Sequence, residues 1–154
     1  MDRIKKAKRY ERLYKQIKDL IDKSSNNHLS DMATICAVLH HKMDYFFWTG
    51  FYLLQDEKLQ VASYQGSLAC IDLKKDTGVC WAGINTKQPL VVGNVHEFPG
   101  HIACDSRSAS EIVIPVYNQK GIAVGVLDVD SSELNSFDEV DAEWLEKIVK
   151  LVKI

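Results

Sequence analysis

Three of the four cysteines lie in local settings that suit thiol chemistry. Cys70 follows a turn-like run, Cys80 follows a Gly-containing segment, and Cys104 lies in a polar stretch. A thiol reacts as its thiolate, and a helix N-terminus or nearby cations lower the thiol pKa. Cys36 is the contrast, because aliphatic residues flank it and a packed cysteine behaves as a small hydrophobe. The sequence therefore predicts three thiols near solvent and one in the core.

These local settings do not single out one nucleophile. Cys80 falls in the first turn of an expected short helix, where the helix dipole favours a thiolate. Cys104 has His101 and Arg107 close to it in a long polar loop. Simple packing is the alternative for any one of the three, because free cysteines are commonly buried.

A zinc site is a second way to use these cysteines, with His96 or His101 as the fourth ligand. Structural zinc sites usually contain close ligand pairs such as Cys-x2-Cys. Here Cys70, Cys80 and Cys104 are separated by 10 and 24 residues. This spacing disfavours zinc, so we expect surface or hydrogen-bonding roles for the two histidines.

Two carboxylates alternate with apolar residues near the end of a predicted strand. Asp128 and Asp130 point to one face of this strand, and Glu111 begins the neighbouring one. Buried acids are costly unless they are paired, bind a cation or reach a solvated pocket. Crowded carboxylates also raise one another's pKa, which would give a group that holds a proton near neutral pH. The alternative is that these side chains lie in open water.

Two large aromatic residues share one face of the first predicted strand. Trp48 and Tyr52 flank Gly50 on that face. Because glycine has no side chain, this arrangement predicts space for a small ligand above Gly50. Packing of both aromatics in the core is the alternative.

The elements that must position these residues follow from hydrophobic periodicity and turn signals. Helices are expected over 2–23 and 30–43, from 76 or 77 to 85, and near the C-terminus, where Ser136 and Glu139 resemble a capping box. On this last helix one apolar face is expected, made of Val140, Trp144, Ile148 and Leu151. Strands are expected over 45–54, 59–64, 90–92, 110–117 and 122–130, with polar loops at 24–27 and 93–107. We predict an α+β fold over residues 1–154, with N-terminal helices and a C-terminal helix on a central antiparallel sheet of about five or six strands.

Size and charge narrow the class of protein. The chain has 154 residues and neither a secretory signal nor an apolar run that could span a bilayer, so we expect one cytoplasmic domain with reduced thiols.

Residues 1–23 hold nine Lys/Arg against four Asp/Glu, which could suit a nucleic acid or a membrane surface. An apolar stripe at helical spacing instead predicts that the lysines form a solvated face, so we expect neither partner. The stripe consists of Ile4, Ala7, Leu13, Ile17, Leu20 and Ile21, with Tyr10 and Tyr14 beside it.

Several short segments together resemble the free methionine-(R)-sulfoxide reductase family, whose members are single GAF domains. These segments are residues 48–54, 64–66 with 69–70, 78–80, 95–106, 110–115 and 127–131. They extend over most of the chain and include all three candidate cysteines in order and spacing. The resemblance implies thioredoxin-dependent reduction of free L-methionine-(R)-sulfoxide to L-methionine, through a cysteine sulfenic acid and an intramolecular disulfide.

The resemblance also implies roles for the candidate residues. Cys104 would be the nucleophile, Cys70 the principal resolving cysteine, and Cys80 an assisting thiol. Trp48 and Tyr52 would surround the methyl group and sulfur of the substrate. The ammonium would be bound, and the proton supplied or held, by Glu111, Asp128 and Asp130. No cofactor is implied, and a homodimer through the terminal helices follows by analogy.

Three other functions compete with this interpretation. A GAF domain of the same fold could sense a small ligand, with incidental cysteines, or it could be a redox sensor without its own substrate. A Cys-His hydrolase is disfavoured, because it would leave two of the cysteines without a role.

Overall fold

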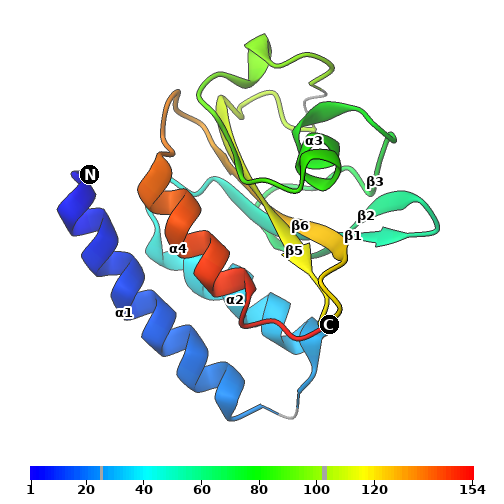
Figure 1. Ribbon diagram of the computed structural model, residues 1–154. Coiled ribbons are helices and arrows are strands. Elements are labelled where there is room, and N and C mark those ends of the chain that lie inside the picture. The colour runs from blue at the N-terminus through cyan, green and yellow to red at the C-terminus, as the bar shows by residue number, and fades with distance from the viewer. Residues whose placement is uncertain (25, 102–103) are drawn as a thin grey trace.

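A computed structural model describes residues 1–24, 26–101 and 104–154. Its elements, in chain order, are α1 (Arg3–Asp22), α2 (His28–Lys42), β1 (Trp48–Gln55), β2 (Lys58–Gln65), β3 (Asp72–Leu73), α3 (Gly78–Thr86), β4 (Leu90–Val92), the 3-10 helix η1 (Val95–Glu97), β5 (Ser110–Tyr117), β6 (Ala123–Ser131) and α4 (Glu139–Val149). The six strands form one antiparallel sheet in the order β3-β2-β1-β6-β5-β4. In Figure 1, α2 and α4 lie between α1 and the sheet, and α3 covers the opposite face. The predicted α+β fold is confirmed.

The two faces of the sheet have separate hydrophobic clusters. Phe51, Ile112 and Leu127 point toward α2 and α4 and belong to the larger cluster. Val113 and Val126 point the other way and pack with α3. This division follows from the two-residue repeat of a strand, which sends alternate side chains to opposite faces. By the same repeat, the carboxylates of β5 and β6 lie on the α3 side.

The predicted strands and helices are present with small shifts in their bounds, and β3 is an addition. β3 has only two residues, too few for an alternating pattern to mark it in the sequence. β1 begins at Trp48 rather than at residue 45, because the chain turns there, with the Phe46 amide bonded to the Met43 carbonyl at 3.0 Å. Residues 93–107, expected as loop, contain η1. Ser25 in the predicted loop at 24–27, and residues 102 and 103, lie outside the described residues.

The predicted capping box of the last helix is wrong. Asp138, not Ser136, is the N-cap of α4, and its carboxylate accepts from the Val140 amide at 2.9 Å. Asp141 completes the box by accepting from the Asp138 amide at 2.8 Å. Ser136 instead shares a hydrogen bond with Ser131. Both pairs have the three-residue spacing that a capping box needs, so spacing alone could not choose between them.

The apolar faces of the terminal helices are rotated from the predicted ones. On α1, Ile4 is 71 % exposed and Leu20 is 46 % exposed, whereas Lys6 is buried. On α4 the buried residues are Asp141, Leu145, Ile148 and Val149. The rotation brings Lys6 against Asp141, so each helix buries one charged residue against the other.

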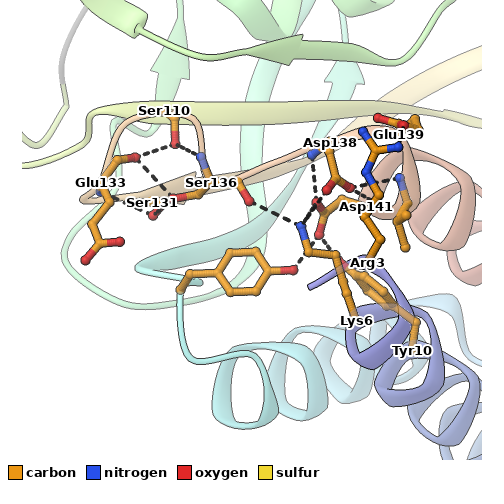
Figure 2. A network of polar contacts seen from close by, with 12 residues as sticks. Arg3, Lys6, Tyr10, Ser110, Ser131, Glu133, Ser136, Asp138, Glu139 and Asp141 are labelled. Carbon is orange, nitrogen blue, oxygen red and sulfur yellow. Dashed lines mark hydrogen bonds and ion pairs between the residues drawn. The ribbon is translucent and has the colours of Figure 1, made fainter. Parts of the chain in front are cut away.

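A buried polar network joins α1 to α4, as Figure 2 shows for Lys6, Tyr10, Asp138 and Asp141. Lys6 Nζ lies 2.7 Å from Asp141 Oδ2 and 3.2 Å from Asp138 Oδ2. The hydroxyls of Tyr10 and Tyr45 donate to Asp141 Oδ1 at 2.6 and 2.5 Å. Buried charges are tolerated when they are paired and hydrogen-bonded, and this network meets both conditions.

No helix among the described residues is long and apolar enough to cross a bilayer.

Candidate active site

A cavity of about 100 Å³ lies on the α3 side of the sheet, below the loops that carry two of the cysteines. All eight residues predicted for the site contribute to its lining, although they are spread over positions 48 to 130 of the chain. They are Trp48, Tyr52, Cys70, Cys80, Cys104, Glu111, Asp128 and Asp130. The fold therefore gathers the whole predicted set around one space.

Two of the cysteines form a disulfide in the lining of this cavity. Cys70 and Cys104 are 34 residues apart in sequence, and their Cα atoms are 5.6 Å apart. Cys104 is exposed and Cys70 is half-buried, so solvent reaches this bond. While this bond is present, Cys70 and Cys104 cannot form the zinc site considered with Cys80, because bonded sulfurs are not thiolate ligands.

Ser67 and Asp105 connect the same two loops a second time. Ser67 Oγ donates to Asp105 Oδ2 at 2.8 Å. Arg107 donates to both carboxylate oxygens of Asp105, at 3.0 and 2.7 Å. These bonds hold the pKa of the Asp105 carboxyl below its usual range, with Arg107 as the largest cause.

The sequence suggests that the Arg107 cation could activate Cys104. In the structure its guanidinium instead forms an ion pair with Asp105. Ser67 and Asp105 were missed as site residues. The signal available was local, since each lies within three residues of a predicted catalytic cysteine. The loop of Ser67 is also tied to the sheet, because Trp48 Nε1 donates to the Ser67 carbonyl at 3.0 Å.

The expectation that Cys80 lies near solvent is wrong. Cys80 lies in the first turn of α3, is only 5 % exposed and belongs to the second hydrophobic cluster. Burial, followed by the charges of Asp128 and Glu111, raises the pKa of its thiol well above the usual value. The helix-dipole effect predicted from the sequence is therefore outweighed by desolvation. Cys36 is buried as predicted, and burial raises its thiol pKa to about 12.

The three carboxylates meet at the wall of the cavity. Asp130 pairs with Glu111 on β5 and with Trp48 on β1, and Asp128 is the next residue on the same face of β6. Glu111 is 5 % exposed and Asp128 is 6 % exposed, so the alternative of open water is wrong. Burial is the largest cause of a raised pKa for all three carboxyls, and Asp128 adds to the shift of both Glu111 and Asp130.

Trp48 and Tyr52 make the aromatic part of the wall. Their rings are stacked with centroids 5.8 Å apart, and the Tyr52 hydroxyl donates to the Cys70 carbonyl at 3.2 Å. The space predicted above Gly50 is not open, since a Cβ there would lie 2.5 Å from the Trp48 indole. Glycine is needed at this position so that the indole can lie across the strand.

His101 also lines the cavity, whereas the exposed His96 does not. Among the described residues, His101 Nε2 is buried without a hydrogen-bond partner. Burial, and then the neighbouring His96, lower the pKa of His101, so its ring is neutral above that pKa. The hydrogen-bonding role expected for His101 stays a prediction.

Residues 32–154 match the model of the GAF domain, so α1 precedes the matched part. The chain is 46 % identical over 148 residues to GAF domain-containing protein A of Dictyostelium discoideum, covering 96 % of this chain and 92 % of that protein. It is 38 % identical over 121 residues to free methionine-R-sulfoxide reductase of Escherichia coli, covering 79 % of this chain and 73 % of that protein.

Solved structures agree with these relatives. The free methionine-R-sulfoxide reductase of Neisseria meningitidis in complex with its substrate has a TM-score of 0.91 at 37 % identity, covering 99 % of this chain and 89 % of that one. The reduced form of the Staphylococcus aureus enzyme has a TM-score of 0.88 at 38 % identity, covering 94 % and 92 %. The chain therefore belongs to the GAF-domain family of free methionine-R-sulfoxide reductases, which are oxidoreductases.

Proposed function

We propose that this protein reduces free L-methionine-(R)-sulfoxide to L-methionine, with thioredoxin as the reductant. One observation carries the proposal: the Cys70–Cys104 disulfide lies in the wall of a cavity that also contains three carboxylates. A thiol pair supplies two electrons, and a carboxyl cluster supplies a proton. Sulfoxide reduction needs both.

The first step would use Cys104, the more exposed partner of the disulfide. Its thiolate attacks the sulfoxide sulfur, and the substrate oxygen is protonated and passes to Cys104. Methionine leaves as a thioether and Cys104 is left as a sulfenic acid. The substrate gains two electrons and the cysteine loses two, so the step is balanced.

The acids of the cavity would supply the proton. The pKa of Glu111 is raised well above its ordinary value by burial and then by Asp128 and Asp130. A carboxyl that retains its proton near neutral pH can act as a general acid. The group as a whole would also bind the substrate ammonium, since opposite charge compensates buried carboxylates.

Trp48 and Tyr52 would contact the methyl group and sulfur of the substrate. Their stacked rings provide an apolar wall beside the carboxylates, which suits a short side chain that ends in a methyl group. A peptide-bound methionine sulfoxide has no free ammonium to meet the acids. This difference supports the restriction to the free amino acid.

Cys70 would then resolve the sulfenic acid. Its thiol attacks Cys104 sulfur, the disulfide forms, and the oxygen leaves as water. Thioredoxin would return two electrons and two protons to the pair. The exposure of Cys104 supports access by a protein dithiol. An assisting role for Cys80 has less support, because its thiol is buried and its pKa is raised.

The test is a coupled assay in which thioredoxin, thioredoxin reductase and NADPH are mixed with the protein. We expect NADPH consumption with the R epimer of free methionine sulfoxide and none with the S epimer. The N-acetylated R epimer, which lacks the ammonium, is the matched control and should be inactive. Equal activity on both epimers, or no activity on either, would overturn the proposal.

A homodimer through the terminal helices is part of the same proposal. Ile4 and Leu20 expose apolar side chains on α1, and Trp144 on α4 is only half-buried. Exposed apolar side chains on a terminal helix can pack against a second copy of the chain. Light scattering coupled to gel filtration should give twice the chain mass, and Ile4→Glu should reduce it to the monomer mass.

A further inference from the structure

The proposed reaction gives Cys80 only an assisting role, but its thiol lies close to two carboxylates. Its sulfur and one carboxylate oxygen each from Glu111 and Asp128 all lie within 4.8 Å of one another. α3, β5 and β6 contribute one residue each, and all three residues are buried. Three potential anionic ligands therefore meet at one point of the cavity wall.

The cluster lacks a compensating charge. Among the described residues, no Lys or Arg forms an ion pair with Glu111 or Asp128. Asp128 Oδ1 is buried and has no hydrogen-bond partner in the same part of the chain. A buried carboxylate oxygen without a partner is unfavourable, so this atom is a ready acceptor for a cation that enters the cavity.

The ligand types point to zinc among the common divalent ions. A thiolate favours Zn²⁺, whereas Mg²⁺ and Ca²⁺ take oxygen ligands. Zinc bonds of about 2.3 Å to sulfur and about 2.1 Å to oxygen place neighbouring tetrahedral ligands about 3.5 Å apart. The cluster needs to contract by about 1 Å to reach that spacing. Three protein ligands with an open fourth position are typical of zinc sites that exchange ligands.

We propose that Cys80, Glu111 and Asp128 form an inhibitory Zn²⁺ site in the substrate cavity. Binding is not a redox step: Zn²⁺ displaces the thiol proton of Cys80, and a zinc–sulfur bond forms as that proton is released. The inhibition rests on the proposed function, in which Glu111 and Asp128 also bind the substrate ammonium. Zinc and free methionine sulfoxide therefore compete for the same oxygens.

The oxidised protein gives a clean test of the site itself. With Cys70 and Cys104 joined, Cys36 and Cys80 are the free cysteines. We expect the oxidised protein to bind one Zn²⁺ in competition with a chromophoric chelator. Co²⁺ in the same site should show thiolate-to-metal charge-transfer absorption. Cys80→Ser should abolish that absorption and weaken Zn²⁺ binding at least about tenfold, since it removes the soft ligand.

Cys36→Ser is the matched control. Its hydroxyl can still donate to the Ser63 carbonyl, which the Cys36 thiol reaches at 3.4 Å. This variant should bind Zn²⁺ and Co²⁺ as the unmodified protein does. Glu111→Gln should weaken Zn²⁺ binding without removing the charge-transfer band. Equal Zn²⁺ binding by the Cys80→Ser variant and the unmodified protein would overturn the proposal.

Competition between Zn²⁺ and free methionine sulfoxide tests whether the metal site overlaps the substrate site, and its outcomes distinguish failure of the metal site from failure of the proposed function. Free methionine sulfoxide should raise the apparent Kd for Zn²⁺, and EDTA should reverse inhibition of the coupled assay. An active reductase that does not bind Zn²⁺ through Cys80 would overturn the metal site alone. A protein that binds Zn²⁺ through Cys80 but reduces neither epimer would support the metal site and overturn the reductase function.

Discussion

Cys70 and Cys104 are equal partners in a disulfide but differ in exposure, and this difference makes their roles separable. We predict that Cys104→Ser abolishes release of methionine even in a single turnover, because no thiolate attacks the sulfoxide. Cys70→Ser should release one equivalent of methionine per protein and then stop, because its sulfenic acid has no resolving partner. Quantifying methionine by mass spectrometry in the absence of thioredoxin separates the two variants.

Cys36→Ser serves as the control for this series and should turn over normally, because Cys36 lies in the core away from the cavity. A sulfenic acid probe should label Cys70→Ser after the first turnover and should not label Cys104→Ser. If Cys80→Ser loses the first turnover instead, the assignment of the nucleophile to Cys104 is wrong.

Ser67 and Asp105 hold the two cysteine loops together by a hydrogen bond that involves neither sulfur. In the reduced enzyme this contact should keep Cys70 close to Cys104 and so raise their effective concentration for disulfide formation. We predict that Ser67→Ala leaves the first release of methionine unchanged but slows disulfide formation several-fold. Stopped-flow or quenched alkylation of thiols would measure both steps.

Ser106→Ala is the matched control for Ser67→Ala. Ser106 is exposed next to Asp105, and no side-chain hydrogen bond of Ser106 is present in the described part of the chain. Its replacement should change neither step. Equal rates of disulfide formation in Ser67→Ala and the unmodified protein would show that the backbone alone positions the cysteines.

At the scale of elements, the contact between α1 and α4 depends on one buried ion pair. Lys6→Met removes the charge and keeps most of the volume, and it leaves the buried Asp141 without its cation. Loss of one partner of a buried pair costs about 3–5 kcal/mol. We expect about 3 kcal/mol less free energy of unfolding in urea, since Tyr10 and Tyr45 still donate to Asp141.

Arg3→Met provides the comparison on the same helix. Arg3 pairs with Glu139 on α4, but both side chains are largely exposed. Exposed pairs contribute about 0–1 kcal/mol, so the free energy of unfolding should change little. A loss of equal size in both variants would mean that burial of the Lys6 pair does not determine the strength of this contact.

The contact between these helices explains why the predicted apolar stripe of α1 differs from the residues that are buried. Lys6 falls in register with Tyr10, Leu13, Ile17 and Ile21, all of which are buried. A lysine in that register is normally assigned to solvent, because an unpaired buried ammonium is very costly. Its partner Asp141 is 135 residues away in sequence, so no local pattern could indicate the pair.

At the scale of the whole molecule, the carboxylates of the cavity should make stability depend on pH. Their pKa values are raised in the folded protein, so the native state holds protons that the unfolded chain releases. Stability therefore falls as pH rises above the ordinary carboxyl pKa of about 4, and the loss continues until the raised pKa values are passed. The slope is about 1.4 kcal/mol per pH unit for each retained proton.

Glu111→Gln should flatten this slope, since the amide does not ionise. We predict that the Tm of the unmodified protein falls more steeply than that of Glu111→Gln between pH 5 and 8. The difference between the two proteins is the quantity to measure, because His40 and His101 have lowered pKa values and add a slope of opposite sign. Parallel Tm curves would contradict the raised pKa of Glu111.

Much of the site could be predicted because its signals are local. The two-residue repeat placed Asp128 and Asp130 on one face of a strand, and the same repeat grouped Trp48 with Tyr52. The resemblance to a known family added the set of residues that meet in the cavity. The hydrogen bond between Ser67 and Asp105 and the unpartnered oxygen of Asp128 could not be predicted, because each depends on how separate segments of the chain lie in space.

The types of the elements, their order and the faces of the strands follow from the sequence alone, since hydrophobic periodicity and turn residues act over a few positions. Which groups are buried, and which of them come into contact, depends on the tertiary structure. Cys80 is buried, so desolvation outweighs the effect of the helix dipole on its thiol pKa. Lys6 can be buried because it forms an ion pair with Asp141. Burial and pairing depend on contacts between distant parts of the chain, and these contacts set the pKa values that the proposed chemistry requires.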